Sequence, residues 1–330
     1  MADQRSMELP QETGEDRGRH ARSPGEIPVK GLKDVLWRTW HEVTTDKVTM
    51  IAAGVTYYLL LALFPALGVL VTLYGFMADP GDLGRQIDFL ASILPAGAMD
   101  IVNTQLTALA TQEKSTLSLA FVGSFAVALW SANNGMKALF EAMNVAYDEE
   151  EKRGFVRLNL VSLAFTFISL LVAGVLIVAL GVLPAALALI RLDAAAETIL
   201  RLARWPVILI LIGFATVMLY RYGPSRDPAK LRWLTWGATL STLLWLVTSI
   251  AFSWYLENFA DYNATYGTLG ALIAFMVWIW LSVTIVIVGA ELNAELEHQT
   301  TRDSTVGPTR PMGARRAEMA DTVGPAMDAR

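Results

Sequence analysis

The sequence predicts an all-α, polytopic membrane protein with six transmembrane helices, amphipathic surface helices and disordered tails. Apolar stretches recur between positions 50 and 290, and each is long enough to supply the roughly 20 helical residues that cross a bilayer. The stretch 269–290 contains no charged side chain, and no soluble core helix is apolar on every face for that length. Hydrophobic residues form 54% of the 330 residues, whereas charged residues form 17% and gather in tails and connectors.

A single membrane domain is predicted at 29–298, between tails at 1–28 and 299–330. Both tails combine charged residues with Pro, Gly, Ser or Thr and hold few large apolar side chains. Burial in such segments cannot offset the entropy lost on ordering, so we expect both tails to be disordered. The six spans within the domain are predicted at about 50–77, 117–136, 158–183, 205–222, 234–255 and 267–290.

Two segments have the composition of helices at the membrane surface. The first, 29–47, repeats apolar residues at spacings of three and four, which predicts an amphipathic helix. This helix either lies in the lipid headgroup region or packs on the ends of the spans. The second, 83–114, is too polar to span and predicts one or two short helices. The apolar face of the first helix is expected to contain Val29, Leu32, Leu36, Trp40 and Val43.

Proline, glycine and their absence shape the predicted spans. Pro65 lies in the middle of the first span, where the missing backbone donor predicts a kink. No breaker follows the second span, so we expect its helix to continue through 137–147. The sequence GPSRDP at 223–228 predicts a tight turn before the fifth span.

Lysine and arginine counts predict the orientation of the chain in the membrane. The N-terminal segment, the connectors 137–157 and 221–232, and the C-terminal tail together carry 21 of these residues, and the opposite side carries five. Cytoplasmic loops are enriched in both residue types, so both termini are predicted to be cytoplasmic. Three arginines at 191–204 lie on the disfavoured side, which leaves a re-entrant arrangement of that connector open.

The composition excludes several classes of function. The chain has no cysteine, which excludes disulfides, thiolate metal sites and cysteine nucleophiles. Its net charge is −5 and no basic face is apparent, so nucleic acid is not an expected partner. The pair Glu295 and His298 has the spacing of a carboxylate-bridged metal site but lacks matching ligands on other helices. We therefore expect no enzymatic site, no cofactor and no metal.

A polar stripe follows the second span and forms the first group of candidate site residues. Asn133, Lys137, Glu141, Asn144 and Asp148 are spaced by four, four, three and four residues, which places them on one helix face. The stripe either lines a vestibule or headgroup site, with Lys137 as its cation, or is a solvated face with an ordinary Lys137–Glu141 pair. Both interpretations remain open.

Other candidates lie in or beside the first and last spans. Glu291 follows an unbroken apolar span directly, where a carboxylate needs a cationic partner on a neighbouring helix. Tyr57 and Tyr58 lie within the first span and either shape a pathway beside Pro65 or form ordinary interhelical hydrogen bonds. Tyr266, on the connector before the sixth span, fits an aromatic belt as well as a site.

Three blocks carry a resemblance to a known family. They are AAGVTYYLLLALFPAL in the first span, WSANNGMKALFEAMNVAY at 130–147, and YGTLGALIAFMVWIW followed by GAELNAE at 266–295. Over about 30–298 the chain resembles the YihY/virulence factor BrkB family of bacterial inner-membrane proteins. The resemblance implies six helices in the bacterial cytoplasmic (inner) membrane, and an old ribonuclease BN label is attached to the family. The family blocks map onto Tyr57, Tyr58, Pro65, Trp130, Gly135, Asn144, Tyr147, Tyr266, Gly267, Gly270, Glu291 and Asn293.

The leading hypothesis is a transporter or exporter of a polar or lipid-derived solute. The kinked first span and the polar residues that continue the spans motivate it. A non-transporting envelope scaffold is the alternative, and a tRNA-processing ribonuclease is the least favoured, because no constellation for metal-assisted hydrolysis is apparent. The expected partners are the lipid bilayer and the solute, and a homo-oligomer remains open. No nucleotide-binding motif is present, so transport would be facilitated or ion-coupled.

Overall fold

The computed structural model describes residues 14–77, 114–177, 194–258 and 270–327, and within these ranges it is helical. The only β feature there is a single bridge between Ala229 and Thr305. The all-α prediction is therefore confirmed for the described part of the chain. Its helices are η1 (Gly14–Arg17), η2 (Pro24–Glu26), α1 (Val29–Thr45), α2 (Val48–Met77), α5 (Lys114–Ala146), α6 (Phe155–Ile177), α8 (Ala194–Tyr222), α9 (Leu231–Asn258), α11 (Gly270–His298) and α12 (Glu318–Asp321).

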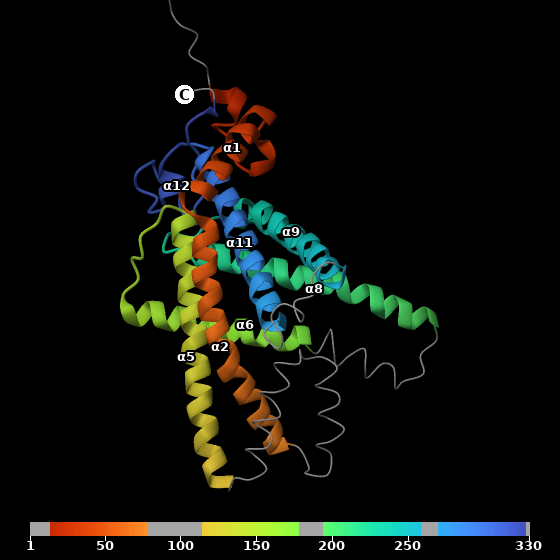
Figure 1. The fold of residues 1–330 in the computed structure, drawn as a ribbon. Coiled ribbons are helices and arrows are strands. Elements are labelled where there is room, and N and C mark those ends of the chain that lie inside the picture. The colour runs from red at the N-terminus through yellow and green to blue at the C-terminus, as the bar shows by residue number, and fades with distance from the viewer. Residues whose placement is uncertain (1–13, 78–113, 178–193, 259–269, 328–330) are drawn as a thin grey trace, which may run out of the picture.

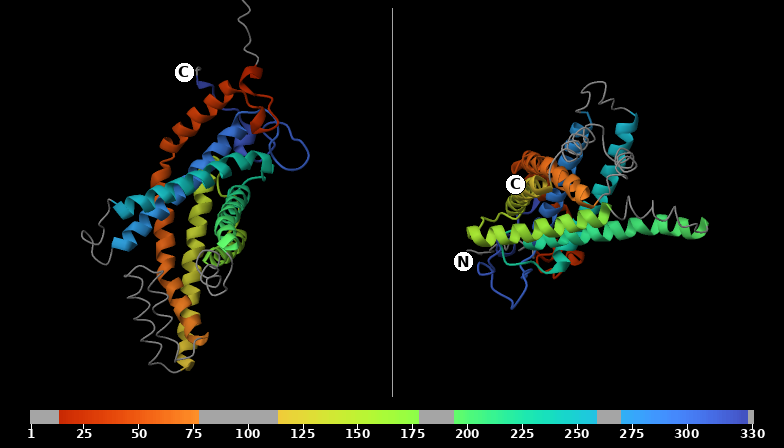
Figure 2. Two further views of the ribbon diagram at one scale, coloured as in Figure 1. Left: turned by 90° about the vertical axis from the view of Figure 1, so that its right-hand side faces the viewer. Right: turned by 90° about the horizontal axis from the view of Figure 1, so that it is seen from below.

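Helix α11 packs against α1, α2, α5 and α9. Helices α2 and α5 run side by side, and α11 lies against both α2 and α9 (Figure 1). Helices α6 and α8 cross the direction of α2 and α5 instead of running along it (Figures 1 and 2). Helices α1 and α12 gather with the last turns of α11, residues 291–298, at one end of the molecule (Figure 1). We name this region the tail end.

Four segments of the described helices are long and apolar enough to cross a membrane. They are Phe155–Val172, Trp205–Tyr222, Leu231–Asn258 and Leu272–His298, and they coincide with the third to sixth predicted spans. Most of their side chains are not buried within the protein, as Ile210 on α8 illustrates with 71% exposure. Large exposed apolar faces of this kind are typical of contact with lipid. The number of six spans stays a prediction, since the described part of α2 contributes only a shorter apolar stretch, Val48–Ala62.

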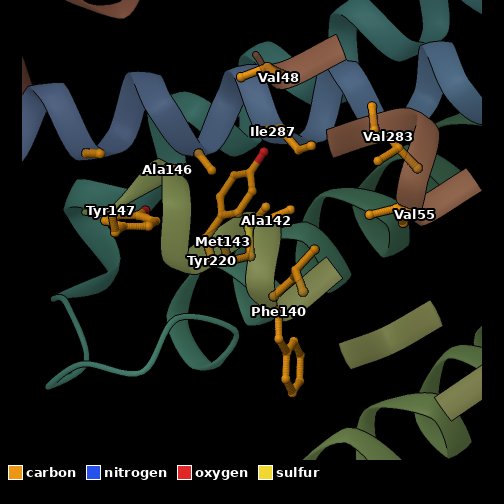
Figure 3. Packing of buried hydrophobic residues seen from close by; sticks show 14 of the residues in the cluster. Val48, Val55, Phe140, Ala142, Met143, Ala146, Tyr147, Tyr220, Val283 and Ile287 are labelled. Atoms are coloured by element: carbon orange, nitrogen blue, oxygen red, sulfur yellow. The ribbon is translucent and has the colours of Figure 1, made fainter. Parts of the chain in front are cut away.

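A compact apolar cluster joins the helices near the tail end. Side chains from α2, α5, α8 and α11 meet there, and Tyr220 extends from α8 among them (Figure 3). Between helices in lipid, such a cluster stabilises the fold through close packing and dispersion contacts and not through removal of apolar surface from water. The labelled members are Val48, Val55, Phe140, Ala142, Met143, Ala146, Tyr147, Tyr220, Val283 and Ile287.

Helices α9 and α11 approach each other closely through glycine. A Cβ atom at Gly237 would collide with the carbonyl oxygen of Gly289 and with the side chain of Asn293. Beside this crossing, Tyr220 donates a hydrogen bond of 2.7 Å to the carbonyl oxygen of Val286. Small residues that allow close backbone contact are a recurrent device in membrane helix packing.

The expected disorder of the tails is wrong for residues 14–28 and 299–327. Arg17 donates hydrogen bonds of 2.8 and 2.9 Å to the buried carboxylate of Asp34 on α1. Gln299 donates to the carbonyl oxygen of Arg17 at 2.8 Å, and the Met327 N–H donates to Asp34 at 3.0 Å. The prediction failed because it counted apolar residues, whereas these segments are held largely by buried charges and hydrogen bonds.

Helix α1 also buries a different face from the one expected. Asp34, Val35 and Arg38 are buried, whereas Leu36 and Trp40 of the predicted apolar face are exposed. Ion pairing decides this orientation, because Asp34 binds Arg17 and Arg38 pairs with Glu295 on α11. Of the two positions left open for this helix, the structure has the one packed on the end of a span.

Three further expectations concern helix boundaries. Helix α5 continues to Ala146, as predicted, and α2 is helical through Pro65. Helix α8 already begins at Ala194, so the described part of the 191–204 connector extends this helix. The predicted surface helices at 83–114, apart from Lys114, lie outside the described residues, as do positions 178–193.

We predict that Gly237→Ala destabilises the protein by about 1–3 kcal/mol, because the added methyl group collides with the backbone of α11. The thermal unfolding midpoint of the purified protein in detergent would measure the loss. Gly54→Ala on α2 is the matched control, since a Cβ atom there meets nothing within 4 Å. Equal midpoints for the two variants would contradict a close α9–α11 crossing.

We predict that Asp34→Asn releases the described tails, because it removes the buried carboxylate that pairs with the Arg17 guanidinium. Limited trypsin digestion should then cleave after Arg17, Arg19 or Arg22 at least several times faster. Asp16→Asn is the control, since Asp16 pairs with Lys30 on the exposed surface. Unchanged cleavage in Asp34→Asn would show that this ion pair does not hold the tails.

Candidate functional site

The last turns of α11 bring a series of polar side chains into the protein interior. Glu291, Asn293, Glu295, Glu297 and Gln299 are each no more than 2% exposed. A buried carboxylate is costly unless a cation or several hydrogen bonds compensate for its lost hydration. The partners of each side chain therefore separate structural groups from candidates for function.

Glu295 and Glu297 have arginine partners. Arg38 of α1 pairs with the Glu295 carboxylate and donates a further hydrogen bond of 2.8 Å to Gln299. Arg226, in the turn after α8, donates to Glu297 at 2.6 Å, and Ser304 donates to the same oxygen at 2.7 Å. These two carboxylates attach α1, the turn and the C-terminal segment to α11, so their role is structural.

Asn293 binds the backbone of α9. Its Oδ1 atom accepts a hydrogen bond of 2.8 Å from the Gly237 N–H, and its Nδ2 atom donates to the carbonyl oxygen of Leu234 at 3.1 Å. The oxygen and the nitrogen of the side-chain amide are thus both used to fix the α9–α11 crossing. The family-derived candidate Asn293 is therefore a packing residue in this structure.

Glu291 is different, because its neighbour is another carboxyl group. Its side chain is 1% exposed, and its Oε1 atom has no hydrogen-bond partner among the described residues. The Asp46 side chain, between α1 and α2, lies near enough to Glu291 for the two carboxyl groups to act on each other electrostatically. Two neighbouring carboxyl groups disfavour a second negative charge, so their proximity favours a proton on one of them. We name Asp46 and Glu291 the carboxyl pair.

The surroundings of the carboxyl pair are acidic. Burial and the nearby Asp148 carboxylate raise the pKa of Asp46 above its ordinary value. Burial and the Glu295, Asp46 and Asp148 carboxylates likewise raise the pKa of Glu42 on α1. Arg38, on the same helix as Glu42, is bound to Glu295. The arrangement therefore favours retention of a proton and can release it when the local charge changes.

The predicted polar stripe on α5 does not act as one surface. Asn133 and Asn144 are buried, Lys137 is half-buried and Glu141 is exposed. Asn144 accepts a hydrogen bond of 2.7 Å from the Ser225 N–H and donates to Glu151 at 3.2 Å. It thus ties the end of α5 to the 223–228 turn, while the Oδ1 atom of Asn133 has no hydrogen-bond partner among the described residues.

The tyrosine candidates are not gathered at the carboxyl pair. Tyr57 is 59% exposed and Tyr58 40% exposed, and their rings contact each other at 5.6 Å between centroids. Both lie on an outward face of α2. The side chain of Pro65 and the whole of Tyr266 lie outside the described residues.

Sequence reasoning missed Asp46, Arg38 and Arg226, which complete the tail end. Each was counted as an ordinary charge in a connector or surface helix. Their partners on α11 are far away in the chain: Glu291 is 245 positions from Asp46, Glu295 is 257 from Arg38, and Glu297 is 71 from Arg226. The one available signal was their adjacency to an apolar span, which does not specify a partner.

Comparison with known proteins places the chain among bacterial membrane proteins. A match to the family described as Virulence factor BrkB covers residues 39–312, which confirms the resemblance carried by the three blocks. The chain is 32% identical to Putative ribonuclease-like protein YfkH of Bacillus subtilis, over 80% of this chain and 94% of the relative. It is 24% identical to UPF0761 membrane protein NTHI0384 of Haemophilus influenzae, over 82% and 97%. No solved structure matches the chain.

We predict an acid-dependent loss of stability at the 147–155 connector. Burial opposes ionisation of Glu151, yet hydrogen bonds from Arg153 and Asn144 lower its pKa to about 2. A lowered pKa means that the ionised side chain stabilises the fold above about pH 4.5, and this contribution is lost as the pH falls towards about 2. Thermal midpoints over this range should fall less in Glu151→Gln than in the unaltered protein or in Glu150→Gln, which alters an exposed neighbour. Parallel curves for all three proteins would contradict the prediction.

Proposed function

Because the chain belongs to the virulence factor BrkB family of membrane proteins, we propose that it transports a polar or lipid-derived solute and couples transport to protons through the carboxyl pair. The observation that carries this proposal is Glu291, a buried carboxyl group that follows the apolar stretch of α11 and has an oxygen without a hydrogen-bond partner among the described residues. The ribonuclease-like name of the Bacillus subtilis relative describes that relative alone.

The contrast among the α11 carboxyl groups supports a functional role for Glu291. Glu295 and Glu297 have arginine partners, whereas Glu291 has a second acid. An ionisable group at the end of a span is expensive to keep without a counter-ion, and such groups typically mark ion or proton pathways. In one state of the transporter, a proton shared by the carboxyl pair removes the repulsion between the two groups. In another state this proton is released, and its release couples proton movement to solute transport.

A cavity beside α11 supports a passage for the solute. It has a volume of about 180 Å³ and lies between α5, α8, α9 and α11. Its surface is almost wholly apolar, because the lining hydroxyl groups donate to backbone carbonyl oxygens; these are the hydroxyl groups of Thr216, Ser241, Thr242 and Ser282. Such a lining suits the apolar part of a lipid-derived solute.

The proposed orientation has the tail end in the cytoplasm and the helices in the cytoplasmic membrane. The asymmetry of lysine and arginine supports it. The contacts between residues 14–28 and 299–327 also support it, because both described tails lie on the same side of the spans. An even number of crossings follows from that arrangement.

A non-transporting scaffold is the second candidate function. The exposed apolar side chains of Val29, Leu36 and Trp40 on α1 favour it, since they offer a face to a partner or to the membrane surface. The tails do not add to this face, because their described parts pack on the protein itself. Stoichiometric cross-linking to one partner through α1, with no solute moved, would support the scaffold instead.

We predict that Glu291→Gln abolishes proton-coupled transport while leaving the protein folded, because the amide occupies the same space but cannot exchange a proton. Metabolites and lipids retained by cells with and without the protein would first identify the solute by mass spectrometry. Uptake of that solute into vesicles containing the purified protein, with an internal pH-sensitive dye, would then measure both fluxes.

Glu150→Gln is the matched control for this experiment, because Glu150 is an exposed carboxylate on the connector after α5. It should retain both fluxes. If Glu291→Gln moves solute and protons as fast as the control does, the carboxyl pair is not the coupling site. If no solute differs between the cells, the transport proposal itself fails.

A further inference from the structure

A second cavity opens beside the tail end, at the edge of the membrane-spanning helices. Its volume is about 380 Å³, and it is formed by the start of α6, the end of α8, the 223–228 turn and Arg316 of the C-terminal segment. It shares no lining residue with the smaller cavity between α8, α9 and α11. The two cavities therefore belong to different places in the fold.

The lining of this larger cavity is strongly cationic. Only one acidic residue, Asp227, is among its lining residues, and that carboxylate is bound to Arg310 at 2.6 Å. We name the cavity, with its basic lining residues, the cationic cavity. Those residues are Lys152, Arg153, Arg157, Arg221, Arg226 and Arg316.

Half of these cations have acidic partners in the fold. Lys152 pairs with Glu149, Arg153 with Glu151 and Arg226 with Glu297, each at 2.6 Å. For Arg157, Arg221 and Arg316, the described part of the chain provides no ion pair. Three guanidinium groups around one cavity repel each other unless an anion lies between them.

Buried donor atoms also lack acceptors at this site. The side chain of Arg226 is 1% exposed, and its Nη1 atom has no hydrogen-bond partner among the described residues. The Nε atom of Arg221 is buried and unpartnered as well, while its guanidinium group lies 5.5 Å from the ring centre of Tyr222. Both atoms are enclosed by the protein, so these two arginines offer a ligand in the cavity the charge of their guanidinium groups, and not these two donor atoms.

The position of the cavity favours a ligand at the membrane surface. Arg157 lies in the first turn of α6 and Arg221 in the last turn of α8, and both helices are candidate spans. Phe155 and Val156, next to Arg157, are 82% and 70% exposed. An apolar surface beside a group of arginines matches the boundary between acyl chains and anionic headgroups.

We propose that the cationic cavity binds a phosphate group, carried either by a lipid headgroup or by a free phosphate ester. Arginine suits this ligand because its planar group donates two parallel hydrogen bonds to neighbouring phosphate oxygens. Arg157 and Arg221 supply positive charge at the membrane surface that no acidic group in the described part of the chain neutralises. This binding does not require that the protein be a transporter.

The test uses the full-length protein, freed of lipid in an uncharged detergent, and titration calorimetry. The probes are inorganic phosphate, dioctanoyl phosphatidic acid, dioctanoyl phosphatidylcholine and acetate. We expect phosphate or phosphatidic acid to bind, and the double variant Arg157→Gln, Arg221→Gln to weaken binding by at least about tenfold. Arg232→Gln is the matched control, since Arg232 is exposed on α9 outside the cavity and should leave binding unchanged.

The probes separate the two sources of phosphate. Binding of phosphatidic acid alone assigns the site to a lipid headgroup, and binding of both phosphate probes assigns it to the phosphate group itself. Binding of inorganic phosphate alone assigns it to a free phosphate ester. If the double variant is poorly folded, Arg157→Gln alone is informative, because Arg157 is exposed. The proposal fails if neither phosphate probe binds, if acetate or phosphatidylcholine binds as tightly, or if the arginine variants bind like Arg232→Gln.

Discussion

Buried charge at the end of α11 is the constraint on which the arrangement of the tail end depends. Glu295 and Glu297 are almost fully enclosed, and each is compatible with the fold only because an arginine from elsewhere reaches it. Arg38 brings α1 onto α11, and Arg226 brings the turn after α8 to the same helix. Removing one member of such a pair leaves an uncompensated buried charge, which is far more costly than losing a surface ion pair. These contacts therefore specify how the segments outside the spans are placed.

Two sites near the tail end depart from this pattern of paired charges. Glu291 lies one turn from Glu295 on α11, yet it meets Asp46 instead of an arginine. On the other side of the tail end, Arg157, Arg221 and Arg316 surround a cavity without acidic partners in the described chain. One site thus has an excess of acid and the other an excess of base, although both adjoin fully paired residues. Sites whose charges are left uncompensated are where a proton or an anion can act as the missing partner.

Packing within the membrane region depends on shape more than on charge. The outer faces of the spans are apolar and exposed, so burial of apolar surface does not select one helix arrangement over another in lipid. Gly237 and Gly289 instead allow close contact, and Asn293 fixes the crossing through the backbone of α9. Tyr220 adds a hydrogen bond to the carbonyl oxygen of Val286. Close backbone contact and a few satisfied polar groups thus orient α9 against α11.

The sequence by itself determined the class of the protein, the approximate positions of four spans and the presence of Glu291 at a span end. Hydropathy is a local property, and a long charge-free stretch such as 269–290 permits few structures. The three sequence blocks also identified the family. Disorder in the described tails was predicted wrongly, because local composition cannot register the distant partners of Arg17 and Arg38.

Only the tertiary structure decided which polar residues are compensated. Asn293 and Asn144 became packing residues once their partners were known, and the α5 stripe divided into buried and exposed members. Asp46 and Arg226 were added to the candidate sites because only the structure shows which residues lie beside them. Each of these outcomes depends on contacts between residues far apart in the chain, and the spacing of residues along one helix does not specify such contacts.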